Sequence, residues 1–85
     1  MVDVICGKLY RHFKGDLYLV ENIGYDCETM KQVVIYRALY GDCKVFVRDY
    51  DSFTSKVDLK KYPLTKQKYR FELVDIESVK GCEDK

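Results

Sequence analysis

The stretch "VVIYRALYGDCKVFVRDY", from Val33 to Tyr50, places the strongest constraint on the fold of this chain. It holds four aromatic residues, many β-branched residues and two arginines, and a Gly-Asp pair at 41–42 divides it. Aromatic and β-branched side chains pack well on a pleated sheet. Two such runs joined by a short glycine-containing break are typical of a β-hairpin. We therefore expect paired strands at 32–40 and 44–50.

The rest of the chain is also strand-like. Glycine-containing or polar turns separate runs of apolar and aromatic residues, and no segment keeps a helical period over ten residues. The further expected strands are 8–13, 17–25 and 69–74, with short helical turns at most near 27–31 or 51–62. Five to six short strands predict a mainly β protein, either a small, strongly bent antiparallel sheet or an SH3-like barrel.

Length and charge limit the classes of protein that fit. The 85 residues allow one small β domain, 1–74, followed by a charged tail at 75–85 that we expect to be frayed. A net charge of +1 argues against a molecule that binds nucleic acid through its whole surface. No apolar run of about 18 residues is present to span a membrane. The first residues do not resemble a signal peptide, so we expect a cytoplasmic protein without membrane contact.

The cysteines and the single histidine do not form a recognisable catalytic or metal-binding pattern. Cysteines stand at positions 6, 27, 43 and 82, without the C-x-x-C spacing of a compact zinc site, and free thiols are the expected state in a reducing compartment. An enzyme that uses Cys27 or Cys43 with His12 is a weaker alternative, because the sequence supplies no partner that orients such a pair. We expect no cofactor, no metal and no enzymatic activity.

The arginines among the aromatic residues are more informative. Alternation along a strand puts Arg37 on the same face as Val33, Ile35 and Leu39, and a charge in that setting must be paired or must line a cavity. Arginine beside aromatic rings suits planar anions, because the rings stack on a base and the guanidinium binds phosphate. Alternatively, the arginines form a structural network with acidic partners, for which the candidates are Glu21, Asp49 and Glu72. The predicted ligand-binding residues are Tyr10, His12, Tyr36, Arg37, Tyr40, Phe46, Arg48 and Arg70.

Several motifs occur together in the order of a known family. They are "GKLYRHFKG" (7–15), "ET" (28–29), "VVIYRALYGD" (33–42), "VFVRDYDSF" (45–53) and "YRF" (69–71). The chain resembles the bacterial and phage domain-of-unknown-function family 1653, which implies a small β domain and leaves the activity open. Two positions differ from the family's pattern: Phe46 stands where tryptophan is usual, and Asp49 where proline is usual. The second change frees a backbone donor and is expected to loosen the bend after Arg48.

These observations favour a non-enzymatic binding module for a small anionic ligand of nucleotide type. A chain this short has little room for an enclosed pocket, so a homo-oligomer that forms its pocket between copies is expected. A phage counter-defence protein that sequesters a nucleotide signal fits these features. The alternative is a β-barrel module that binds nucleic acid or another protein; the low net charge makes nucleic acid the less favoured partner.

Overall fold

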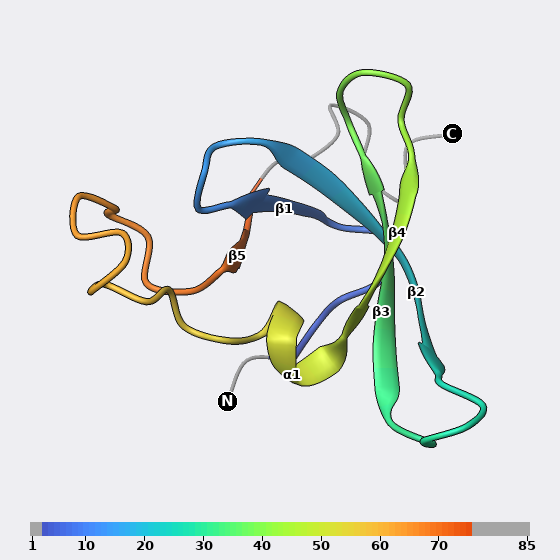
Figure 1. Cartoon of the computed structure of the whole chain (residues 1–85). Helices are drawn as coiled ribbons and strands as arrows, with labels where there is room; N and C mark the ends of the chain where they lie inside the picture. Colours follow the sequence, from blue (N-terminus) through green and yellow to red (C-terminus); the bar gives the residue numbers. More distant parts are fainter. Residues whose placement is uncertain (1–2, 76–85) are drawn as a thin grey trace.

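The structure, a computed structural model, describes residues 3–75 and shows one five-stranded antiparallel sheet with a single short helix (Figure 1). The elements are β1 (Leu9–His12), β2 (Leu17–Tyr25), β3 (Gln32–Ala38), β4 (Val45–Asp49), α1 (Tyr50–Phe53) and β5 (Phe71–Leu73). Their order across the sheet is β4-β3-β2-β1-β5. The last strand therefore pairs with the first, and β4 and β5 form the two edges.

Local chemistry explains where the strands turn. Gly15, between β1 and β2, has a φ of 109°, a conformation that only glycine adopts without strain, and its amide donates to the carbonyl of His12 at 2.7 Å. Between β2 and β3 the carboxylate of Asp26 accepts from the amides of Glu28 and Thr29 at 2.8 and 3.1 Å. These bonds lower the pKa of Asp26. This connection is a turn without an assigned helix, and within residues 3–75 the assigned helix is Tyr50–Phe53.

A β-bulge in β2 changes which side chains point to the core. The pairing of β2 with β3 shifts between Val20 and Asn22, so Glu21 is the extra residue. Leu17 and Leu19 therefore lie on the outer face, while Ile23 packs against the core. Strict alternation along 17–25 would predict these three residues on one face, and the structure differs because the bulge resets the alternation.

The hydrophobic core lies on the other face, which we call the inner face. It is built from one or two residues of each central strand, with Phe53 of α1 and Phe71 of β5 covering them. The Phe53 and Phe71 rings stack in parallel with their centroids 4.1 Å apart, and both are almost fully buried. The buried cluster is Val4, Tyr10, Val20, Val34, Tyr36, Phe53 and Phe71. Aromatic rings therefore supply most of the core volume in this small domain.

The chain after α1 returns to the sheet without closing a barrel. The amide of Arg70 donates to the carbonyl of Ser55 at 2.8 Å, and the amide of Val57 donates to the carbonyl of Lys68 at 2.9 Å. Residue pair Lys56 and Tyr69 forms an isolated bridge at the same place. The strongly bent antiparallel sheet is thus confirmed and the barrel alternative is not, because β4 and β5 stay unpaired with each other.

The predicted tail falls almost entirely outside the described residues, of which Asp75 is the last. Within residues 3–75, no helix is long and apolar enough to span a membrane.

Candidate binding face

Aromatic side chains form a continuous surface on the inner face, with Tyr18 of β2 at its centre. Its ring contacts Tyr36, Phe71 and Tyr40 edge-on, with centroid distances of 5.3, 5.5 and 5.6 Å. Edge-to-face contacts are the favoured geometry for aromatic pairs. Tyr36 and Phe71 are buried, Tyr18 is half-buried and Tyr40 is exposed. The cluster therefore continues from the core to the protein surface.

Arg48 enters this surface from β4. Its position opposite Val34 in the sheet register puts it on the inner face. Nε donates to the Tyr36 hydroxyl and Nη1 donates to Ser52 Oγ, both at 3.1 Å, and the guanidinium lies 5.8 Å from the centre of the Phe71 ring. In the described part of the chain, no carboxylate lies within ion-pair distance of Arg48. The guanidinium charge therefore contacts two hydroxyl groups and an aromatic ring, all of them neutral.

Arg70, which precedes β5, is joined to Arg48 through serines. Arg70 Nε donates to Ser55 Oγ at 3.1 Å, and Ser55 Oγ donates to the carbonyl of Ser52 at 2.6 Å. Ser52 is also the partner of Arg48. Residues 3–75 provide no carboxylate partner for Arg70 either, because Glu72 accepts from the backbone amides of residues 68 and 69 instead.

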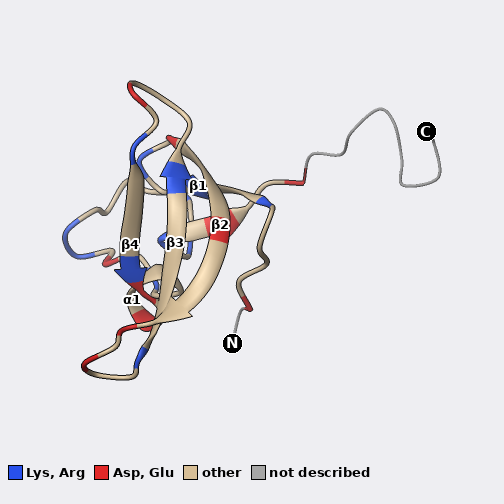
Figure 2. Cartoon of the chain, turned by 90° about the vertical axis from the view of Figure 1, so that its right-hand side faces the viewer, with Lys and Arg blue, Asp and Glu red and all other residues tan. Residues whose placement is uncertain are grey.

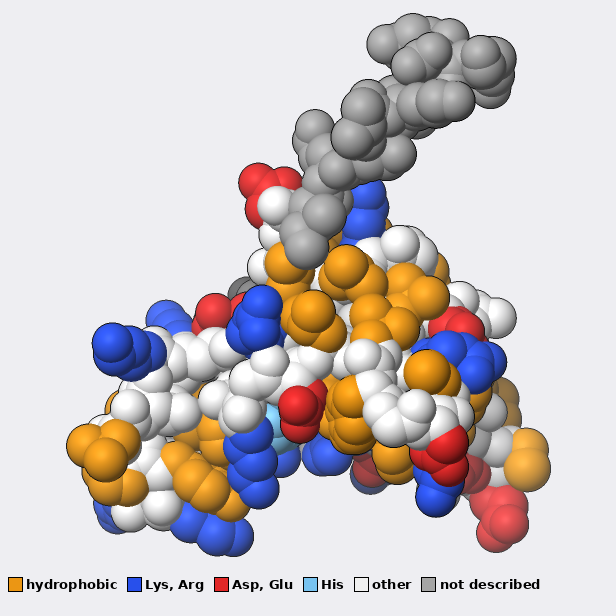
Figure 3. Space-filling model, turned by 90° about the horizontal axis from the view of Figure 1, so that it is seen from above, with side chains coloured by type: hydrophobic (Ala, Val, Ile, Leu, Met, Phe, Trp, Pro, Cys, Tyr) orange, Lys and Arg blue, Asp and Glu red, His pale blue; other side chains and the backbone are white. Residues whose placement is uncertain are grey.

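His12 lies beside these arginines at the end of β1. Burial lowers its pKa, and the positive charges of Arg48, Arg70 and Lys14 lower it further, while Asp16 acts in the opposite direction. Nδ1 accepts from the amide of Lys14 at 3.1 Å, so the neutral ring carries its proton on Nε2. In Figure 3 the histidine, pale blue, is visible at the surface among Lys and Arg side chains, with an acidic group nearby. The imidazole thus adds a neutral donor to a positive surface.

Tyr40 and Phe46 provide the exposed aromatic groups of the same face. The hydroxyls of Tyr40 and Tyr18 share a hydrogen bond of 2.6 Å, and burial together with this bond raises the pKa of Tyr18. Phe46 lies opposite Tyr36 in the sheet register and is 39% exposed. Tyr40 and Phe46 leave accessible ring surface beside the arginines.

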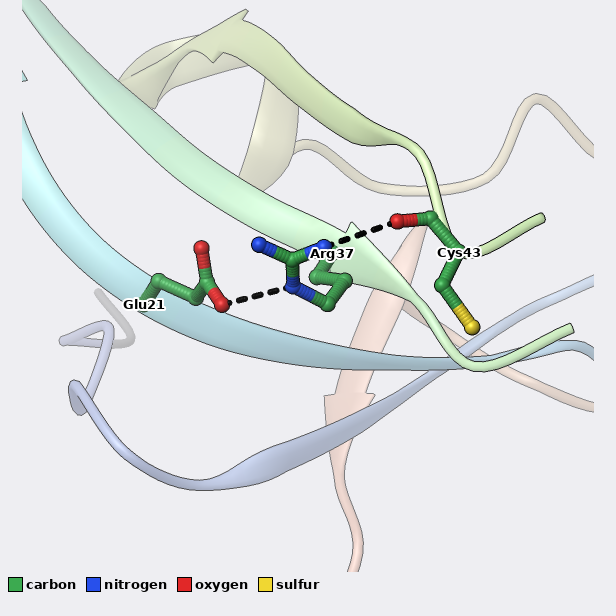
Figure 4. A network of polar contacts seen from close by, with 3 residues as sticks. All are labelled: Glu21, Arg37 and Cys43. Carbon is green, nitrogen blue, oxygen red and sulfur yellow. Dashed lines mark hydrogen bonds and ion pairs between the residues drawn. The ribbon is translucent and has the colours of Figure 1, made fainter.

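Arg37 does not belong to this face. It lies opposite Val45 on the outer face, where Nε donates to Glu21 at 2.8 Å and Nη1 donates to the carbonyl of Cys43 at 2.9 Å (Figure 4). The hydrogen bond and the charge of Glu21 raise the pKa of Arg37. The hypothesis that Arg37 and Arg48 build one site is therefore corrected. Neighbouring positions along paired strands point to opposite faces, and Arg48, opposite Val34, lies an odd number of positions away from the Arg37–Val45 pair. The structural pairing predicted with Glu21 is found for Arg37.

The predicted residues are divided between the two faces of the sheet. Arg37 stands apart on the outer face, and the others lie on or beside the inner face. Those that the inner face brings together are Tyr10, His12, Tyr36, Tyr40, Phe46, Arg48 and Arg70. Tyr10 is buried, and its hydroxyl accepts from the amide of Ile5 at 2.9 Å, so it is part of the core.

Sequence reasoning missed Tyr18, Phe71 and the two serines. Tyr18 could have been found from the turn at 13–16, because a tight connection there pairs Tyr18 with Tyr10 and so puts it on the core side. No sequence signal identifies these serines, since the turn of α1 brings Ser52 to Arg48 and the fold of the segment after α1 brings Ser55 to Arg70.

A shallow pocket of about 470 Å³ continues this surface beyond His12. The Phe13 ring, which contacts the His12 ring at 4.4 Å, forms one wall. The lining residues are Phe13, Lys14, Lys61, Tyr62, Pro63, Leu64 and Thr65. A mostly apolar pocket whose lining includes two lysines thus adjoins the positive aromatic surface.

Comparison with known proteins agrees with the motifs in the sequence. A crystal structure of a DUF1653 protein from Bordetella bronchiseptica matches with a TM-score of 0.68 and 27% identity, over 87% of this chain and 92% of that chain. No curated protein matches the chain. The family model described as a protein of unknown function (DUF1653) matches residues 8–73, which include all five strands of the sheet. On this evidence the chain belongs to the DUF1653 family.

Proposed function

We propose that this protein is a non-enzymatic module that binds a small, planar anion of nucleotide type on the inner face. The observation that carries the proposal is the state of Arg48. Its guanidinium lies over an aromatic ring, hydrogen-bonded to hydroxyl groups and, within residues 3–75, without a carboxylate partner. Arg37 on the same hairpin has its carboxylate partner. A partly buried charge without a counter-charge favours an anion at that place.

The surroundings of Arg48 suit the two parts of such a ligand. Arg70 and Lys14 add positive charge near His12, with Asp16 as the opposing charge. Phosphate or carboxylate oxygens are expected to accept hydrogen bonds from Arg48, Arg70 and the Nε2 proton of His12. A planar ring can stack on the exposed aromatic groups or in the neighbouring apolar pocket.

Binding without catalysis is supported by the positions of the thiols. Cys27 lies in the β2–β3 turn, at the opposite end of β2 from the β1–β2 turn beside His12. Cys43 lies in the β3–β4 turn, where its carbonyl binds Arg37 of the outer face. A module of this kind acts by sequestering its ligand in the cytoplasm, which is the role expected of a phage counter-defence protein.

The test is a thermal-shift and calorimetric screen of mononucleotides, dinucleotides and cyclic nucleotides against the wild type and three variants. Arg48→Met and Arg70→Met are expected to lose most of the binding, because each removes a charge and keeps an apolar stem. Arg37→Met is the matched control and is expected to bind as the wild type does. Native mass spectrometry of protein purified from cells should show a retained small ligand.

Three outcomes would contradict the proposal. One is the absence of any shift or heat with every nucleotide, with no ligand retained from cells. Another is binding only of single-stranded oligonucleotides, with an affinity that falls steeply with salt, which is the mark of a nucleic-acid module. Equal loss in the Arg37 and Arg48 variants would also contradict the assignment to the inner face.

A further inference from the structure

The β4 edge of the sheet has backbone groups that pair with nothing in residues 3–75. The amide of Ala38 in β3 donates to the carbonyl of Lys44 at 2.9 Å, which fixes the direction of the backbone at the start of β4. In an antiparallel pair, successive residues turn their N–H and C=O groups alternately toward and away from the partner strand. The even-numbered residues of β4 therefore face β3, and the odd-numbered residues face away from the sheet.

Three residues present these outward groups: Val45, Val47 and Asp49. In the described sheet β4 has a strand neighbour on one side only, and its residues Val45 and Val47 are 44% and 64% exposed. Figure 2 shows β4 as the outermost strand beside β3 and β2. The stretch Val45–Val47 carries no proline and no charge, which are the usual devices that protect an edge from pairing. The edge is open, apolar and long enough for a second strand.

We propose that a second copy of this chain occupies the edge, with the two β4 strands antiparallel and Val47 of each copy facing Val47 of the other. This register lets all three outward-facing residues pair, because Val45 of one copy then meets Asp49 of the other. A shift by two residues in either direction leaves one of these residues, Val45 or Asp49, without a strand partner in each copy. Self-pairing also satisfies the two-fold symmetry that most homodimers have.

The same register has a consequence on the inner face, and this part depends on the proposed function. Phe46 of one copy lies opposite Arg48 of the other, at the distance of directly opposed strand residues, about 5 Å between Cβ atoms. An arginine beside an exposed aromatic ring forms a favourable cation–π contact. Each anion site then receives an aromatic ring from the second copy, and the exposed face of Phe46 becomes part of a deeper, shared site.

The first test measures mass in solution by sedimentation over a wide range of protein concentration. The wild type is expected to approach the mass of two chains as the concentration rises. Val47→Lys should shift this transition to at least about tenfold higher concentration, because two like charges then face each other at the two-fold axis. Leu64→Lys, at a 93% exposed loop residue, is the matched control and should behave as the wild type. A wild type that remains monomeric at every concentration overturns the proposal.

The second test fixes the register by cross-linking in a chain whose four native cysteines are replaced by serine. In that background Val47→Cys should form a disulfide-linked dimer under mild oxidation, because opposed strand residues lie within disulfide range. Val45→Cys alone should not, since its partner is Asp49, whereas a mixture of Val45→Cys and Asp49→Cys chains should form mixed dimers. Equal cross-linking of Val45→Cys and Val47→Cys alone would contradict the register.

Neither test requires a ligand, so each reports on the dimer alone. If the wild type dimerises and no nucleotide binds, the dimer stands and the proposed function fails. If the protein stays monomeric and a nucleotide binds, the reverse holds. A strand of a different protein on the same edge is also distinguishable, because the purified chain then shows no self-association.

Discussion

The two arginines of the central hairpin, Arg37 and Arg48, lie on opposite faces of one sheet and have different contacts. Arg37 lies on the solvent-exposed outer face, forms an ion pair with Glu21 and donates a hydrogen bond to the carbonyl of Cys43 in the β3–β4 turn. Arg48 lies on the inner face, half-buried over Phe71, and within the described residues it holds only hydroxyl groups. The first arginine stabilises a turn and a bulge. The second carries a charge that the described fold leaves without a carboxylate, and this difference separates structural arginines from candidates for binding.

The largest effect that should distinguish the two faces is the removal of a core aromatic ring. Phe53→Ala removes the ring that stacks on Phe71 and is expected to cost about 3–5 kcal/mol of unfolding free energy. Val47→Ala on the outer face, at a 64% exposed residue, should change it by less than about 0.5 kcal/mol in dilute protein. Urea unfolding followed by circular dichroism measures both. Similar costs would mean that the core does not lie where the structure puts it.

The second effect compares the arginines directly. Arg48→Met should lower the unfolding free energy by about 1.5–3 kcal/mol, because hydrogen bonds from a charged donor to two hydroxyls are lost and the Tyr36 hydroxyl is left without this partner. Arg37→Met should cost clearly less, since its ion pair with Glu21 is exposed to solvent. The same urea titrations apply. A larger loss for Arg37→Met would reverse the comparison.

A smaller effect, of opposite sign, is expected at the end of β4. Asp49 has a φ of −54°, within the range that proline adopts. Its amide faces away from β3, so no hydrogen bond within the sheet is lost when proline removes it. Its side chain makes no cap hydrogen bond to α1. Asp49→Pro is therefore expected to raise the unfolding free energy by about 0.4–1 kcal/mol, because proline reduces the conformational entropy of the unfolded chain. Ala38→Pro is the control and should destabilise the domain, because the Ala38 amide donates within the sheet. Thermal melts of both variants decide whether the two sides of this hairpin differ as described.

The smallest effect is the pH dependence contributed by His12 on the inner face. Because its pKa is lowered in the folded protein, the unfolded chain binds the proton more readily. The neutral His12 ring therefore contributes to the folding stability. This contribution is complete above the usual histidine pKa of about 6.5 and is lost as the pH falls through the lower pKa of the folded protein. His12→Gln should show a shallower loss of the urea midpoint between neutral and acidic pH than the wild type. Nuclear magnetic resonance titration of this single histidine measures its pKa, which should rise when an anion binds beside it.

Strand positions were predictable from the sequence, because aromatic and β-branched residues mark strands and glycine marks the turns. The prediction of strand 17–25 agrees with β2 as observed. Whether Arg37 lies on the outer or the inner face was not predictable. Alternation shows which residues share a face, but it does not show which of the two faces is buried. The bulge at Glu21 adds to this difficulty, because nothing local distinguishes Glu21 from its neighbours. The acidic partner of Arg37 was nevertheless among the expected candidates.

The aromatic character of the site was also predictable, whereas its geometry was not. Tyr36, Phe46 and Arg48 were identified because arginines stand among aromatic residues in the predicted hairpin. Ser52 meets Arg48 locally, four residues along in α1, whereas Arg70 joins them only through its bond to Ser55, 15 residues earlier in the chain. Contacts between residues so distant in the chain leave no periodic signal in a single sequence.

The pairing of the last strand with the first has a consequence for synthesis of the chain. β1 pairs with β5 through residues such as His12 and Phe71, so one side of β1 lacks its final neighbour until the ribosome has added Phe71. At translation rates of about 5–20 residues per second, the interval between these two residues lasts about 3–12 s. During this time the nascent protein has an unpaired strand, and from the addition of Phe53 until that of Phe71 it also has an uncovered Phe53 ring. Premature termination before Phe71 should therefore yield aggregation-prone fragments, and chaperones that recognise exposed aromatic residues should bind the unfinished chain.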